Sequence, residues 1–192
     1  METSRLATAV ITTTLVVALV GGCGGPDSRV LELLRQSNSH LKKAAEYLGQ
    51  VAELGRKQAE FDKGQTDAEG LKETLNEARK VAEASLDEVK KAAVALKSAG
   101  EYRSSGGTKT YIEMKVDAVE EQKKSLETGL QAMGLRTELA DDTISGVQSS
   151  EEVVQTLKRI SELDEETERH ADRAAELHKK ADNYYEGKNS GN

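Results

Sequence analysis

The chain has 192 residues, which suffices for one domain with a hydrophobic core but not for two of ordinary size. Charged residues make up 32% of it and aromatic residues only 3%, so a core must rely on Leu, Val, Ile and Ala. The net charge of −7 disfavours nucleic acid as a partner, because such a surface repels phosphates. Cys23 is the only cysteine, which excludes a disulfide framework, a CxxC redox pair and a cysteine-based zinc site.

The first 22 residues have the three-part composition of an export signal. Arg5 supplies a positive charge, residues 6–20 are mostly apolar, and Gly21 and Gly22 follow. The apolar run is shorter than the roughly 20 residues that a spanning helix needs, so an uncleaved signal anchor is the less favoured alternative. The junction Val20-Gly21-Gly22-Cys23 resembles the lipobox of bacterial lipoproteins.

This resemblance implies cleavage between Gly22 and Cys23, a diacylglyceryl thioether on the Cys23 sulfur and acylation of the new amino group. Two buried acyl chains anchor a protein stably to a bilayer, whereas one binds only marginally. We therefore expect the body to be held outside the cytoplasm, at the cell membrane or the outer membrane. Gly24 stands where the Gram-negative pattern places the Asp that marks retention at the inner membrane.

The mature chain predicts four helical segments. We divide it into a signal peptide (1–22), a lipidated tether (23–27), a helical domain (28–187) and a polar tail (188–192). The first helix is expected over about 28–63, where Leu34, Leu41 and Leu48 recur every seven residues. Capping boxes predict the starts of the other three, namely Thr66 with Glu69, Thr110 with Glu113 and Ser149 with Glu152.

The segments between these helices predict turns. Residues 104–107 form a Ser-Ser-Gly-Gly loop, Gly134 is expected to interrupt the third helix, and residues 141–146 are expected to turn. The apolar seam of the fourth helix is predicted to run through Val153, Leu157, Ile160, Leu163, Thr167, His170, Ala174, Leu177, Ala181 and Tyr184.

The helices are similar in length and joined by short connections, which favours neighbours that run antiparallel. The predicted fold is all-α, an antiparallel up-down four-helix bundle with long helices that resemble those of coiled coils. An elongated three-helix bundle and an oligomeric coiled coil are the alternatives. Alanine-rich seams would bring the helices close together over a shallow core.

The residues predict no catalytic centre and no cofactor. Cys23 is assigned to lipid, no Ser lies in a Gly-x-Ser-x-Gly turn, and residues 106–110 lack the order of a phosphate-binding loop. The Glu-x-x-His pattern of di-iron bundles is missing before His170 and His178. A metal site from His170 and Glu166, one turn apart, is disfavoured because such pairs on charged helices are usually solvated.

One partial metal motif lies in residues 141–152. Asp141, Thr143, Ser145, Gly146 and Glu152 occupy positions 1, 3, 5, 6 and 12 of a loop that resembles an EF-hand. A helix stop at Gly146 and a helix cap at Ser149 explain the same residues without calcium. We therefore leave calcium binding open at this point.

An up-down topology would place Tyr102, Tyr111, Tyr184 and Tyr185 at the anchored end, where they either meet the bilayer or plug the bundle. The far tip would carry Asp62, Asp67, Asp141 and Asp142. The expected function is non-enzymatic: a spacer, assembly or binding role in the cell envelope, through the Cys23 lipid and a protein partner on the helical surface, with homo-oligomers as an option. The alternative is a sensor or carrier that holds a small molecule between helices.

Overall fold

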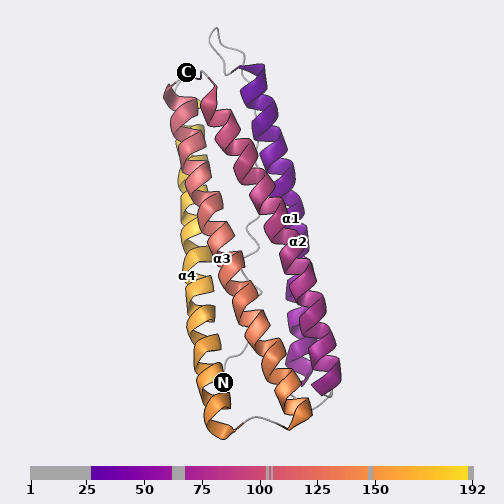
Figure 1. Cartoon of the computed structure of the whole chain (residues 1–192). Helices are drawn as coiled ribbons and strands as arrows, with labels where there is room; N and C mark the ends of the chain where they lie inside the picture. The colour runs from indigo at the N-terminus through magenta and orange to yellow at the C-terminus, as the bar shows by residue number, and fades with distance from the viewer. Residues whose placement is uncertain (1–26, 62–67, 103, 105, 147–148, 190–192) are drawn as a thin grey trace.

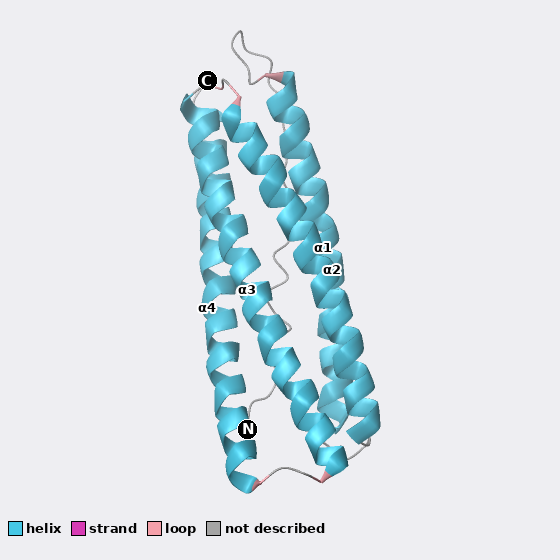
Figure 2. Ribbon diagram, viewed as in Figure 1, coloured by secondary structure: helices cyan, strands magenta, loops and turns pink. Residues whose placement is uncertain are grey.

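The structure is a computed structural model that describes residues 27–61, 68–102, 104, 106–146 and 149–189. These residues form four long helices and no strand (Figure 2). The helices are α1 (Ser28–Phe61), α2 (Ala68–Glu101), α3 (Gly106–Ser145) and α4 (Ser150–Asn189). At 34 to 40 residues each, they are about 50 to 60 Å long.

The helices form an antiparallel up-down bundle, so the predicted fold class is confirmed (Figure 1). The start of α1 and the end of α4 lie at one end, here called the proximal end, and the turn between α3 and α4 lies at the distal end. α1 packs on α2, α2 on α3 and α3 on α4. Between α1 and α4 no pair of described Cα atoms comes within 8 Å, so each of these two helices has one close neighbour.

Local hydrogen bonds explain where two of the helices begin. Asp27 accepts a hydrogen bond from the Arg29 amide at 2.8 Å, which caps α1 where the sequence predicted its start. The predicted capping box of α4 is confirmed, because Glu152 accepts from the Ser149 amide at 3.1 Å and the Glu152 amide donates to the Ser149 hydroxyl at 3.4 Å. Thr66, in the box predicted for the second helix, lies outside the described residues.

Three predicted boundaries of α3 are wrong. The helix begins at Gly106, so Thr110 is not its cap and instead donates to the Gly106 carbonyl oxygen at 2.9 Å within the helix. Gly134 lies inside α3 without ending it, and the expected turn at residues 141–145 is the last turn of α3. The chain leaves the helix only at Gly146, whose φ of 67° lies in the left-handed region that favours glycine.

The core is thin and rich in alanine, as its composition predicted. The side chains below 2% exposure that have the largest volume are Ile112, His178, Val30, Val89, Val119, Ser37 and Ser85. Neither Leu nor Phe is among them, and His and Ser are. A cluster of apolar residues from all four helices joins the proximal half, including Val30, Val89, Ile112 and Ala181.

The seam predicted for α4 is correct along most of the helix and wrong at its start. Ile160, Leu163 and Ala174 are buried. Leu157 is 50% exposed, although the heptad spacing placed it in the seam. A periodic pattern identifies the apolar face of a helix, but the packed length of that face depends on where the neighbouring helix lies.

Leu163 and Leu157 therefore give a matched pair of variants. Leu163 is 3% exposed, and we expect Leu163→Ala to lower the free energy of unfolding by about 2 to 4 kcal/mol through lost burial and a cavity. We expect Leu157→Ala to lower it by less than about 1 kcal/mol. Urea unfolding followed by circular dichroism measures both. Equal losses would show that Leu157 is packed as tightly as Leu163.

Candidate functional site

The residues that the sequence assigned to lipid attachment, Gly22 and Cys23, lie outside the described residues. α1 begins at Ser28, so only a few residues separate the predicted lipid from the helical body. None of the helices that the structure describes is both long enough and apolar enough to cross a membrane. The site built by the described residues is a set of polar contacts between helices, arranged in three clusters.

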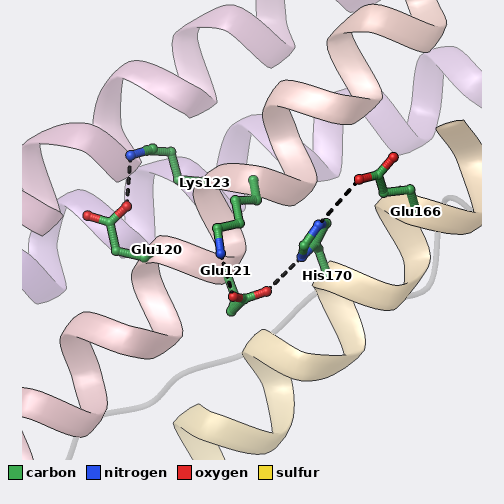
Figure 3. Close-up of polar contacts among 6 residues, drawn as sticks. Glu120, Glu121, Lys123, Glu166 and His170 are labelled. Carbon is green, nitrogen blue, oxygen red and sulfur yellow. Dashed lines mark hydrogen bonds and ion pairs between the residues drawn. The ribbon is translucent and has the colours of Figure 1, made fainter.

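The first cluster joins α3 to α4 near the middle of the bundle (Figure 3). Glu121 points from α3 toward His170 on α4, and its Oε2 lies 2.6 Å from His170 Nδ1. Lys124 donates to the other Glu121 oxygen at 2.8 Å. These hydrogen bonds, the one from Lys124 foremost, hold the pKa of Glu121 below its usual value despite burial, so the carboxylate stays ionised. His170 Nε2 lies 3.8 Å from Glu166, beyond hydrogen-bond distance.

A neighbouring carboxylate extends this cluster to α2. Glu120 accepts from Lys97 of α2 and from Lys123 of α3, each at 2.7 Å. The hydrogen bond from Lys123, followed by that from Lys97, lowers the pKa of Glu120. Adjacent residues of α3 therefore hold two different helices, Glu120 to α2 and Glu121 to α4.

The second cluster repeats this chemistry between α1 and α2. His40 Nδ1 lies 2.7 Å from Glu88 Oε2, and Lys91 donates to the other Glu88 oxygen at 2.8 Å. The hydrogen bond from Lys91 and then that from His40 lower the pKa of Glu88 to about 2. In each cluster the lysine lies three residues after the glutamate, on the same face of the helix.

A serine lies one turn from each of these glutamates and ties the same pair of helices through the backbone. The Ser85 hydroxyl donates to the Ala44 carbonyl oxygen, and the Ser125 hydroxyl donates to the Thr167 carbonyl oxygen, both at 3.0 Å. Small residues allow these contacts, because only closely spaced helices bring a serine hydroxyl within reach of the neighbouring backbone.

The third cluster is the most buried and lies nearer the proximal end of α3 and α4. Lys115 is only 4% exposed, and its ammonium lies 2.7 Å from Asp182 and 3.4 Å from His178 Nδ1. Burial lowers the pKa of Lys115, although the hydrogen bond to Asp182 raises it. His178 is 2% exposed, and burial lowers its pKa to about 3.

Three of the four tyrosines expected at the proximal end plug the bundle. Tyr111 is 3% exposed, and its ring centroid lies 5.1 Å from that of Tyr185. Burial raises the pKa of Tyr111. Tyr184 and Tyr185 are half-buried against the core. Tyr102 is 37% exposed, and its ring lies 6.0 Å from the Arg29 guanidinium.

The resemblance of residues 141–152 to a calcium loop does not extend to its geometry. Asp141, Thr143 and Ser145 lie on α3, where the Thr143 hydroxyl donates to the Leu139 carbonyl oxygen at 2.7 Å. Asp141 forms an ion pair with Lys72 of α2. A continuous helix directs positions 1, 3 and 5 of the motif to different sides, so they cannot surround one ion.

The acidic tip is likewise less charged than the sequence indicated. Lys72 partners Asp141, while Asp62 and Asp67 lie outside the described residues. No group of three or more His, Cys, Asp and Glu side chains within the described ranges is placed to hold a metal ion.

The chemistry of all three clusters is that of helix pairing. Both oxygens of Glu88 and of Glu121 are occupied by cations of the same chain. The clusters could not be read from the sequence, because residues 40 and 88, or 121 and 170, are joined only by the topology. A weak signal exists in hindsight, since a histidine, a lysine and a glutamate fall on heptad positions that otherwise hold Ala and Leu.

Comparisons with known proteins leave the chain without a relative: no family model, curated protein or solved structure matches it.

The Lys115–Asp182 pair allows a test of how buried charge contributes to stability. We expect Asp182→Asn to cost about 3 to 5 kcal/mol of unfolding free energy at neutral pH, because it leaves a buried ammonium without its carboxylate. The double variant Lys115→Met/Asp182→Asn should recover most of that loss, because it removes the buried charge. Chemical denaturation of the single and double variants measures both values. A double variant no more stable than Asp182→Asn would contradict this account.

Proposed function

We propose that this protein is a lipid-anchored lipoprotein of the cell envelope, whose helical body acts without catalysis as a spacer or as a surface for a protein partner. The observation that carries the body's part of the proposal is the shape and chemistry of the bundle. Four helices, each about 50 Å or longer, lie side by side, and the buried ionisable groups are engaged in holding neighbouring helices together.

The anchor rests on the lipobox resemblance at Gly22 and Cys23 and on the position of α1. Because α1 starts at Ser28, a diacylated Cys23 would hold the proximal end close to the bilayer. The distal turn at Gly146 would then lie about the length of a helix from the membrane. That geometry suits a spacer, or a platform that presents its far end to a partner.

Exposed apolar side chains support a contact role for the distal end. Among described residues, five large apolar side chains are exposed, and three of them, Ile144, Val154 and Leu157, lie near the turn between α3 and α4. Exposed apolar side chains that gather in one place often mark interaction surfaces. Chemical crosslinking on intact cells, followed by capture of the protein, would identify a partner at this end.

The lipid anchor predicts a specific N-terminal peptide. We expect the protein purified from its membrane fraction to begin at Cys23, with a mass increase that matches two or three acyl chains. Cys23→Ser should lack that increase and move to the soluble fraction, while circular dichroism and melting stay unchanged because the helical body begins later. Mass spectrometry of the N-terminal peptide measures this. A native chain that begins at Met1 with a free thiol would disprove the anchor.

A further inference from the structure

We propose that His178, Lys115 and Asp182 form an acid-sensitive latch, which releases the C-terminal turns of α4 from α3 when His178 gains a proton. This inference concerns the helical body alone and does not depend on the lipid anchor. It rests on the contacts of the His178 ring, on the single neighbour of α4 and on a second histidine of opposite behaviour in the same interface.

The contacts of His178 have room for only one ring proton. Lys115 binds Asp182 at 2.7 Å as an ammonium, so it is the donor toward His178 Nδ1 at 3.4 Å. The hydrogen of the neutral ring then lies on Nε2, which is enclosed and has no hydrogen-bond partner. A second proton would go to Nδ1, where it would remove the acceptor that faces Lys115 and place two cations side by side.

The surroundings offer no carboxylate to balance that second charge. α3 contributes Lys115 and Tyr111 to this region, and α4 contributes Asp182 and Tyr185. Asp182 is already bound to Lys115. A charged His178 would therefore be stable only where water reaches it, and this requires the two helices to separate.

The topology allows that separation to stay local. α4 packs on α3, and none of its Cα atoms comes within 8 Å of a described Cα of α1 or α2. The C-terminal turns of α4 can therefore leave α3 without disturbing the contacts of α1 with α2 or of α2 with α3. Opening would expose the α3 surface around Tyr111 and Lys115, which the closed bundle covers.

A second histidine in the same interface responds to acid in the opposite sense. His170 Nδ1 lies 2.6 Å from Glu121, a carboxylate whose pKa is held low mainly by Lys124. Protonation of His170 turns this hydrogen bond into an ion pair and strengthens it. His170 lies about two turns before His178 on α4. Acid therefore loosens α4 beyond His170 and tightens it at His170, so the interface opens from its proximal end only.

The pH range follows from the ring in its two environments. The pKa of His178 is about 3 when buried and about 6.5 when exposed to water. The closed state is therefore fully favoured above about pH 6.5 and loses stability as the pH falls from there toward 3. Over that range the ratio of open to closed molecules rises by up to about tenfold for each pH unit.

Distances between paired spin labels test the latch in the full chain. Cys23→Ser removes the only natural cysteine, so labels attach only where cysteines are introduced. The test pair is Glu113→Cys with Asn183→Cys, two exposed positions beside the contacts of Lys115 and Tyr185. The control pair is Gln131→Cys with Glu165→Cys, two exposed positions in the distal half of the same interface.

Pulsed electron paramagnetic resonance at about pH 7.5 and about pH 4.5 then compares the two pairs. The lower value stays above the usual Asp pKa of about 3.9, so most carboxylates remain ionised. We expect a longer-distance population to appear at the acid pH for the pair at 113 and 183, and to be absent for the pair at 131 and 165. A test pair that keeps its distance, or two pairs that lengthen together, would overturn the latch.

Variants of each histidine assign the effect. His178→Leu and His178→Gln cannot titrate in this range, and whichever folds at neutral pH should keep the short distance at acid pH. His170→Gln should let the opening reach the control pair, because it removes the contact that acid strengthens. Acid opening that persists unchanged in a folded His178 variant would overturn the proposal, and the comparison of label pairs in the parent chain decides it if neither variant folds.

Discussion

The close approach of alanine-lined helices is the constraint on which the rest of this structure depends. Alanine buries little apolar area, so a seam of alanines contributes less to stability than one of leucines. It does bring the helix axes close together, and this places serine hydroxyls within 3.0 Å of carbonyl oxygens on the neighbouring helix. Polar contacts thereby supply the specific pairing that a thin apolar core cannot supply by itself.

The position of each helix in the bundle determines how its surface is used. α2 and α3 each pack on two neighbours, so residues on two sides of these helices are buried. α3 illustrates the result, since Lys115, Glu121 and Gln122 are buried on it together with Ile112 and Val119. α1 and α4 have one close neighbour each and keep a single packed stripe. The edge helices can therefore move without repacking the whole core.

The histidines show how one residue type takes opposite roles in one fold. His40 and His170 face carboxylates near the bundle surface, where a proton on the ring adds to an existing contact. His178 faces a lysine in the interior, where a proton has no counter-charge. The side chain across the interface decides between the two roles. A body on the outer face of a membrane, as we propose for this one, would meet changes in external pH directly.

The sequence by itself determined the local features of this protein. Heptad spacing of Leu34 and Leu41 marked the packed face of α1, the Ser149 box marked the start of α4, and the scarcity of aromatic residues foretold an alanine-rich core. These features depend on neighbours along the chain, whose effects are readable from spacing.

Only the tertiary structure decided which polar residues meet and how far each seam is covered. Lys115 and His178 are 63 residues apart, and nothing in the spacing of either indicates burial or contact. The same holds for Leu157, whose heptad position is correct although its neighbour does not cover it. α3 also extends through Gly134 and past Asp141, where the sequence predicted breaks. Its contacts with two other helices, which local propensity does not record, outweigh the preferences of these residues.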